Sequence, residues 1–400
     1  MSFTADLHLH SRFAYACSRR LTLANMTAWA KLKGIDLLST ADFTHPVWLA
    51  ELEENLRPAG EGDYVFDGVR FVLGTELSCV YKQGGRSRRV HLLVFAPDFE
   101  TVHGIRDMLT GLNAKLNGDG RPTVRASARD LTARLLDINP ACMVVPAHIW
   151  TPWYGMLGSK SGFDALDECF EDMAPEIHAV ETGLSSDPEM NWRVPALAGK
   201  TIVSFSDAHS LPNMGRELTV FRGDAGYRDL SAGLKDNGVE STMEFFPEEG
   251  KYHLSGHRRC GISLTPDETG PSGSNCPQCG RPLTLGVLHR VRELSGPDLP
   301  VNQKPAEEGA RRPYARLVPL NELLAHTLGR GRATKSVGLA YRRICGELGG
   351  EVRVLTQAGF DDLERVGGEA LAIAVTKVRD GQVRIVPGFD GQYGTVLPAG

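Results

Sequence analysis

The segment DLHLHS, residues 6–11, continues an apolar run that starts at Phe3 and is typical of a β-strand. His8 and His10 are two residues apart, so on an extended chain both imidazoles project from the same face. One cation can therefore bind both rings. This short segment predicts a strand that ends in a metal site.

Five further segments join an apolar run to a histidine or a carboxylate: STADFTH (39–45), GTELS (74–78), VHLLVF (90–95), PAHIW (146–150) and SFSDAHS (204–210). Buried imidazoles and carboxylates that only hydrogen-bond to one another are the alternative. So many ionisable groups without cations would cost roughly several kcal/mol each in desolvation and repulsion. We therefore predict a multinuclear metal site with the ligands His8, His10, Asp42, Glu76, His91, His148, Asp207 and His209.

Two positions leave alternatives open. Asp42 and His45 compete for one ligand position, and we favour Asp42 because it comes first after its strand. Glu181 could ligate a metal, orient a ligand histidine or hold a water. Mixed histidine and carboxylate ligands suit zinc, manganese or iron better than calcium or magnesium alone.

Strand-like runs alternate with helical patterns in the first part of the sequence, which is typical of a parallel α/β sheet. The runs are 3–9, 35–39, 70–74, 90–95, 143–147, 177–181 and 201–205. A helix is predicted over 23–33, with Thr22 as N-cap and Gly34 after its end. Seven strands with functional groups at their C-terminal ends favour a distorted α/β barrel over an open doubly wound sheet.

A second motif predicts a small structural zinc site. His257 and Cys260, and then Cys276 and Cys279, are each separated by two residues, the two-knuckle spacing of a zinc ribbon. His253 is a possible substitute for His257. Closing such a site would stabilise this short segment by roughly 10 kcal/mol or more.

We divide the chain into a catalytic barrel (1–247), a zinc ribbon (248–292), a linker (293–313) and a mainly helical C-terminal domain (314–400) that binds DNA. The linker is rich in Pro and Gly, and the last segment has apolar helical periodicity that ends in PGFDGQYG. The length of 400 residues, with 42% hydrophobic content, is enough for two or three domains.

Composition favours a cytoplasmic protein, because no apolar run approaches the roughly 20 residues of a membrane span. The eight cysteines are expected to be buried thiols or ribbon ligands rather than disulfides. A net charge of −5 argues against nonspecific binding of polyanions. Local basic clusters such as Lys82 to Arg89 are still compatible with a DNA-binding groove.

Aromatic residues crowd into HIWTPWYGM, directly after His148. They could plug the core, or they could form a stacking surface for a nucleobase beside the metals. Small hydroxyl residues in GLSSD could donate hydrogen bonds to phosphates. The candidate DNA-binding residues are Trp150, Trp153, Tyr154, Ser185, Ser186 and Lys82.

DLHLHS, GTELS, the histidine after strand four, PAH and SDAH together resemble the PHP (polymerase and histidinol phosphatase) superfamily over roughly residues 1–246. The resemblance implies a distorted (β/α)7 barrel that holds up to three metals for phosphoester hydrolysis. Asp42 stands where the superfamily usually has a histidine, and Glu76 matches the bridging carboxylate. Residues 12–18, RFAYACS, carry no His or Asp at the place of a further ligand, so occupancy of a third site stays open.

AVETGLSSDPEMNWR, SFSDAHSLPNMGRE, CPQCG and PGFDGQYG resemble, in the same order, one family of DNA repair nucleases within this superfamily. That resemblance implies cleavage of the phosphodiester bond 5′ to a deaminated base (uracil, hypoxanthine or xanthine) or an abasic site. It also implies a nucleoid-associated enzyme whose contacts with replication or repair proteins cannot be predicted from the sequence.

A base inside a duplex must be flipped out to reach a metal centre at a barrel mouth. Zinc in the ribbon and the barrel, or Mg²⁺ or Mn²⁺ at the catalytic centre, would polarise the phosphate and activate water. The expected catalytic residues are Asp207, Glu76, His8 and His10. A small-molecule phosphatase of the histidinol phosphate type and a non-catalytic DNA-binding protein are the alternatives.

Overall fold

The computed structural model describes residues 1–269, 275–295 and 311–400. Its first part contains β1 (Ser2–Asp6), α1 (Leu23–Lys33), β2 (Leu37–Ser39), α2 (Pro46–Asn55), β3 (Arg57–Pro58), β4 (Asp63–Phe66), β5 (Val69–Gln83), β6 (Arg86–Ala96), α3 (Phe99–Gly111), β7 (Thr123–Val124), α4 (Ala128–Ile138) and β8 (Met143–Pro146). There follow α5 (Leu166–Phe170), β9 (Ala179–Glu181), α6 (Pro188–Trp192), β10 (Thr201–Val203), β11 (Leu218–Arg222), α7 (Tyr227–Lys235) and β12 (Val239–Glu244).

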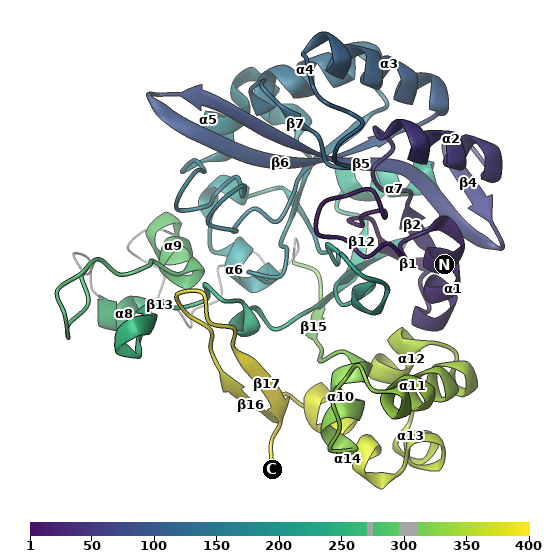
Figure 1. Ribbon diagram of the computed structural model, residues 1–400, viewed down its shortest axis with the longest axis vertical. Coiled ribbons are helices and arrows are strands. Elements are labelled where there is room, and N and C mark those ends of the chain that lie inside the picture. The colour runs from purple at the N-terminus through teal and green to yellow at the C-terminus, as the bar shows by residue number, and fades with distance from the viewer. Residues whose placement is uncertain (270–274, 296–310) are drawn as a thin grey trace.

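The remaining elements form a small unit and a helical lobe (Figure 1). The small unit contains β13 (Ser255–His257), β14 (Ile262–Leu264), α8 (Pro266–Thr269) and α9 (Val287–Leu294). The lobe and its flanking strands contain β15 (Tyr314–Arg316), α10 (Leu320–Thr327), α11 (Lys335–Leu348), α12 (Glu351–Thr356), α13 (Phe360–Gly367), α14 (Glu369–Arg379), β16 (Val383–Val386) and β17 (Thr395–Pro398).

The central sheet is mixed rather than parallel, which corrects the expectation from the sequence. Its strand order is β15-β12-β11-β1-β2-β5-β4-β3, and β6 joins β5 to β8. β1, β2 and β5 are parallel, whereas β5 and β6 form a long antiparallel hairpin. Gly84 and Gly85, with φ of 58° and 73°, turn the chain directly between them, so no crossover helix can intervene.

The closed barrel stays a prediction. β9 and β10 form a separate parallel pair, in which β9 packs beside β8 and β10 beside β12. These packing contacts fit a distorted ring of strands, but no hydrogen-bonded ladder among the described strands closes it. The α/β class itself is confirmed.

The predicted start of the helix at 23–33, now α1, is confirmed by its capping bond. Asn25 N donates to Thr22 Oγ1 at 3.3 Å, and Gly34 ends α1 in a left-handed conformation. Ser127 caps α4 in the same way, with Asp130 N as donor at 2.9 Å. α1 carries Trp29 and Leu32 on its surface toward the C-terminal lobe, where they pack against that lobe's core.

A buried ion pair joins the two lobes. Lys33 Nζ of α1 lies 2.5 Å from Glu351 Oε2 of α12, with side-chain exposures of 2% and 4%. Glu351 also accepts hydrogen bonds from Leu320 N and Tyr341 Oη. The helical lobe is therefore fixed to α1 by a satisfied charge as well as by apolar packing.

The boundaries predicted between domains stay predictions, but two elements cross them. β15, expected in the C-terminal domain, pairs in parallel with β12 and so extends the central sheet. α9 continues past 292 to Leu294. Most of the predicted linker, 296–310, lies outside the described residues.

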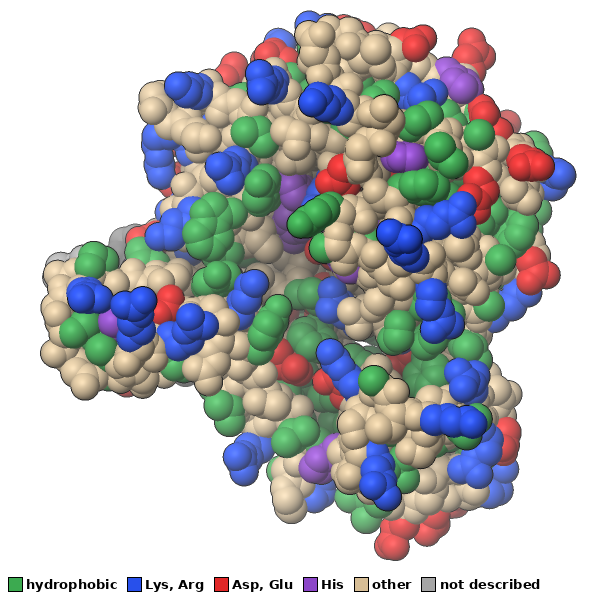
Figure 2. Space-filling view, viewed as in Figure 1, with side chains coloured by type: hydrophobic (Ala, Val, Ile, Leu, Met, Phe, Trp, Pro, Cys, Tyr) green, Lys and Arg blue, Asp and Glu red, His purple; other side chains and the backbone are tan. Residues whose placement is uncertain are grey.

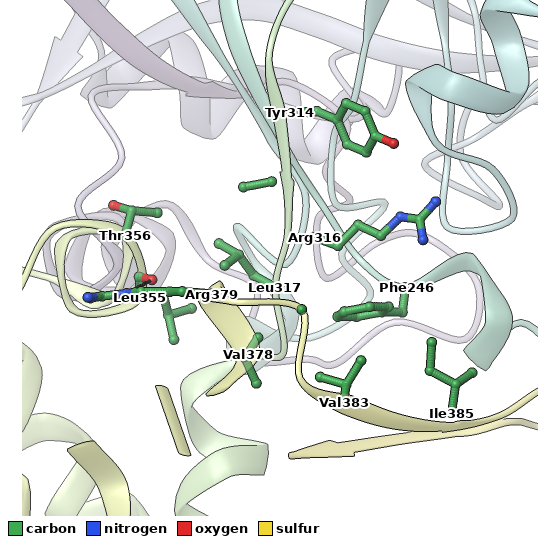
Figure 3. Close-up of a pocket in the computed structure, with 12 residues that line it drawn as sticks. Phe246, Tyr314, Arg316, Leu317, Leu355, Thr356, Val378, Arg379, Val383 and Ile385 are labelled. Carbon is green, nitrogen blue, oxygen red and sulfur yellow. Dashed lines mark hydrogen bonds between the residues drawn. The ribbon is translucent and has the colours of Figure 1, made fainter. Parts of the chain in front are cut away.

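A cleft of about 500 Å³ lies between β15 and the helical lobe (Figure 3). Both of its arginines are already engaged: Arg316 pairs with Asp187 and Glu248, and Arg379 donates to three carbonyls at the end of α12. No helix among the described residues is long and apolar enough to cross a bilayer.

Candidate metal centre

The eight predicted ligands come together in space from six strands and the loops that follow them. His8 and His10 follow β1, Asp42 follows β2, and His148 follows β8. Glu76 and His91 lie inside β5 and β6 rather than at their ends, because this hairpin extends well beyond the site. Asp207 and His209 follow β10.

Glu76 is the central carboxylate. Its Oε1 lies 2.5 Å from His91 Nδ1 and 3.2 Å from His148 Nε2. Its Oε2 lies 3.5 Å from His8 Nε2 and 3.4 Å from His10 Nε2. One carboxylate thus faces four imidazoles, as a bridge between cations requires.

Asp207 faces the same rings from the solvent side. Its Oδ1 lies 3.5 Å from His8 Nε2, 3.1 Å from His10 Nε2 and 3.5 Å from His209 Nδ1. The Asp207 side chain is 25% exposed, whereas His8 and His10 are fully buried. Asp207 therefore marks the open side of the site, where a substrate could approach.

Three overlapping groups could each hold an ion, since the donor atoms within each group lie within 4.8 Å of one another. They are His8 with His10 and Glu76; His10 with Asp207 and His209; and Glu76 with His91 and His148. His8 Nε2 is buried without a hydrogen-bond partner, although it points at two carboxylates. A buried donor left in this way fits a metal ligand.

The electrostatics of the protein alone agree with this arrangement. Burial opposes protonation of His8, but the carboxylates of Glu181, Asp207 and Glu76 outweigh it and raise the His8 pKa well above its ordinary value. Burial likewise opposes ionisation of Asp207, yet His8 and His10 hold its pKa well below the usual range. The site therefore stabilises ionised carboxylates next to positively charged groups.

Asp42 lies behind the ligands instead of among them. Its Oδ1 lies 3.4 Å from His10 Nδ1, and its Oδ2 accepts a hydrogen bond from Ser11 N at 2.6 Å. His10 thus points its Nε2 toward Glu76 and Asp207 while Asp42 holds the other ring nitrogen. This geometry favours an orienting carboxylate, and direct ligation of a metal by Asp42 stays a prediction.

Glu181 has the same role on His8. Its carboxylate lies 2.9 Å from His8 Nδ1 and accepts a hydrogen bond from His148 N at 2.7 Å. His45 lies away from the donor atoms, with its ring stacked on Phe13 at 4.2 Å.

Backbone strain is concentrated at these strand ends. Ala41, Asp42, His148 and Asp207 all have positive φ, between 31° and 56°. Residues without a glycine's freedom keep such conformations only where the surroundings impose them, and functional sites are the usual places.

Sequence reasoning missed Arg121. Its Nη1 lies 3.2 Å from Glu76 Oε2, on the loop that precedes β7. A loop arginine between glycine and proline carries no spacing signal, so only the folded chain reveals this contact. It adds a fixed positive charge beside the bridging carboxylate.

The ribbon ligands also come together. Donor atoms of His257, Cys260, Cys276 and Cys279 lie within 4.8 Å of one another, and Cys279 Sγ is 3.6 Å from His257 Nδ1. Three sulfurs and one imidazole suit zinc. His253 is buried elsewhere and does not join this group.

The predicted DNA-binding residues separate into two sets. Trp150 is only 1% exposed and donates to Asn191 Oδ1, and Ser186 is fully buried with its hydroxyl bonded to Thr182 O. Neither can touch a ligand in this structure, so both expectations are wrong for their side chains. The others are accessible: Trp153 and Lys82 are exposed, Ser185 and Tyr154 half-buried.

Tyr154 connects the metal centre to the surface. Its ring centre lies 4.5 Å from that of His91, and Arg89 Nη1 lies 3.4 Å from its hydroxyl. Figure 2 shows histidine side chains in a hollow at the middle of the view, with Lys and Arg side chains on the surfaces around it.

The chain is similar to several known proteins. A family model, the MJ0043 C-terminal domain, matches residues 319–382. The Bacillus subtilis protein YqxK is 29% identical over 413 residues, covering 98% of this chain and 99% of that protein. The Methanocaldococcus jannaschii protein MJ0043 is 31% identical over 255 residues, and the match covers 62% of this chain but only 31% of that longer protein.

Two solved structures match the whole chain. The lesion-specific endonuclease PfuEndoQ from Pyrococcus furiosus has a TM-score of 0.87 at 30% identity, covering 100% of this chain and 96% of that one. Endonuclease Q in complex with a 27-mer duplex that carries an abasic lesion at the active site has a TM-score of 0.86 at 31% identity, with 100% and 97% covered.

The fold and the converging donors define a phosphoesterase domain of the PHP superfamily. Within that superfamily, the chain belongs to the endonuclease Q family.

Proposed function

We propose that this protein is a metal-dependent DNA repair endonuclease that hydrolyses the phosphodiester bond 5′ to a deaminated base or an abasic site. The observation that supports it most strongly is the set of three overlapping ligand groups that share Glu76 and His10. Endonuclease Q, which resembles this chain over its full length, binds an abasic duplex at its active site.

The residues present would hold the ions as follows. His8, His10, Glu76, His91, His148, Asp207 and His209 supply the donors, with Asp42 and Glu181 fixing two of the rings. When bound, such ions polarise a phosphoryl oxygen and lower the pKa of water at the site. Asp207, on the open side, would orient the attacking water, and Arg121 would supply positive charge beside the phosphate.

Recognition would use the surface next to the ligands. A base in a duplex must leave the stack to reach a buried centre, which costs about a few kcal/mol and is easier at damaged positions. Tyr154, whose ring lies beside that of His91, would contact a base that has been flipped out.

The direct test is cleavage of end-labelled duplexes that contain uracil, hypoxanthine, xanthine, an abasic site or no lesion, with and without Mn²⁺, Mg²⁺ or Zn²⁺. We expect metal-dependent cleavage on the 5′ side of the lesion and none of the unmodified duplex. Equal cleavage of unmodified DNA, or no cleavage by the metal-loaded protein, would contradict the proposal.

Asp207→Asn tests the chemistry separately from binding. We expect cleavage to be lost while the Kd for lesion DNA stays within a few-fold of wild type. Release of phosphate from a small phosphomonoester at a rate above that of DNA cleavage would instead favour the phosphatase alternative.

A further inference from the structure

The loop between β16 and β17, residues 387–394, lies against the start of the ribbon rather than against the helical lobe. Leu254 N donates to Gly388 O at 3.0 Å, and Gly388 N donates to Glu248 O at 2.8 Å. Two further bonds run from Gly391 N to Lys251 O at 2.8 Å and from Gly394 N to Glu249 O at 3.0 Å. The PGFDGQYG motif therefore serves to fix this loop on residues 247–254.

This attachment brings Tyr393 beside Lys251, next to a pair of aromatic rings. The ring centres of Trp153 and Tyr252 are 5.7 Å apart, in an edge-to-face arrangement. Lys251 Nζ lies 5.6 Å from the ring centre of Tyr252 and 5.7 Å from that of Tyr393. The rings come from the barrel, the ribbon and the β16–β17 loop.

Two of these three rings are exposed, and Tyr252 is half-buried. Tyr393 is 72% exposed and Trp153 41%, whereas most tryptophans of this chain are buried or half-buried. Trp153 also follows directly on from the metal centre, because its neighbour Tyr154 lies against His91. We term this surface the aromatic rim; it consists of Trp153, Lys251, Tyr252 and Tyr393. The aromatic rim thus starts at the candidate site and leads away from it.

We propose that the aromatic rim binds unpaired nucleotides of a DNA strand by stacking their bases on its rings. This inference rests on the proposed function for its choice of DNA as the occupant. Alternating rings and cations match the chemistry of unpaired DNA, in which bases stack on aromatic faces and phosphates meet positive charge. Lys251 between two tyrosines and Arg89 over Tyr154 supply that alternation.

The location of the aromatic rim beside the metal centre favours unpaired rather than paired DNA as its occupant. Flipping one nucleotide into the metal centre leaves its neighbours and the opposite strand with exposed base faces. Rings next to the centre can cover those faces, whereas a regular duplex presents only base edges and phosphates. The rim would hold the opened DNA while the lesion is in the site.

The test compares a short oligothymidylate with an inorganic polyphosphate oligomer of the same charge, which carries no bases and no lesion. We expect the full-length protein to bind the oligothymidylate at least about 10-fold more tightly, since each stacked base contributes about 5-fold or more. Trp153→Ala/Tyr393→Ala should remove most of that difference. Lys251→Gln should weaken binding of both oligomers, because it removes charge and leaves the rings.

Val47→Ala is the control, because Val47 is an apolar side chain that is 56% exposed but lies on α2, outside the C-terminal domain. Its affinities should equal those of wild type. An unchanged preference for bases in Trp153→Ala/Tyr393→Ala would overturn the inference. Cleavage of lesion duplexes by the wild-type protein, measured on the same preparation, distinguishes that outcome from failure of the proposed function.

Discussion

Gly183 packs directly against His148: a Cβ built on Gly183 would lie 2.7 Å from the Cα of His148. Gly183 also has a φ of 60°, which a side chain would disfavour. The loop after β9 therefore fixes the position of a candidate ligand that follows β8.

Gly183→Ala should displace His148 and lower cleavage of lesion DNA by about 10-fold or more, since small misplacements at a reacting centre have large effects. Gly199→Ala is the matched control, because Gly199 has a φ of 75° but no atom near its missing Cβ. The control should lose only about 1 kcal/mol of stability and keep its activity. Equal activity losses in the two variants would show that strain, rather than His148, is responsible.

Asp42→Asn should weaken metal binding without abolishing it. Because Asp42 holds His10 Nδ1 from behind, removal of its charge should raise the metal Kd by about 10- to 100-fold. Excess Mn²⁺ should then restore cleavage, as measured by titration. Asp207→Asn should not recover under the same conditions, and recovery of both or of neither would contradict the different roles assigned to them.

Glu244 gives the folded protein a pH-dependent stability. Burial raises the pKa of Glu244 to about 8, so its carboxyl keeps a proton that the unfolded chain loses above 4.5. Folding therefore binds a proton in this window, and the contribution of Glu244 to stability falls as pH rises from 4.5 to about 8.

Glu244→Gln should flatten that decline, because glutamine can still accept the hydrogen bond from Ser204 Oγ without titrating. Urea unfolding at several pH values measures it. Glu240→Gln, on an exposed position of the same strand, should follow the wild-type curve. If the stability of Glu244→Gln fell with pH as steeply as that of the wild type, Glu244 would not be the group that binds the proton.

Lys33→Met should destabilise the junction between the lobes by about 3–5 kcal/mol, since it leaves Glu351 buried without its cation. Lys31→Met, two residues earlier in α1, breaks only an exposed pair with Asp67 and should cost about 1 kcal/mol or less. Adding Glu351→Gln to Lys33→Met should recover part of the loss. Urea midpoints followed by tryptophan fluorescence provide the comparison.

The ribbon should hold one zinc ion through His257 and not through His253. His257→Ala should therefore lose about one equivalent of zinc by metal analysis, because a structural zinc site needs four ligands. His253→Ala should keep it. The reverse pattern would assign the ligand to His253.

Much of the candidate site could be predicted because its residues carry local signals. His8 and His10 are two residues apart just after β1, and Asp207 and His209 repeat that spacing after β10. Helix α1 was predictable from Thr22 and Gly34 for the same reason. Features that depend on residues close together in the sequence could therefore be predicted from the spacing of those residues.

The rest depended on contacts between distant segments. Asp42 could not be separated from the ligands by sequence, because its role depends on which nitrogen of His10 it faces. Trp150 and Trp153 are only three residues apart, yet one is buried and the other exposed. The antiparallel β5–β6 hairpin depends on the tight turn at Gly84 and Gly85. The general alternation of strands and helices predicted a parallel sheet instead.

The contact between residues 387–394 and 247–254 also sets an order of events during synthesis. The candidate ligands of the centre around Glu76 all lie within the first 209 residues, so they can assemble while the ribosome is still making the ribbon. Tyr393 joins Lys251 and Tyr252 only after more than a hundred further residues have emerged. A chain interrupted before that point would carry the donors for phosphodiester chemistry without the complete surface that we propose holds opened DNA.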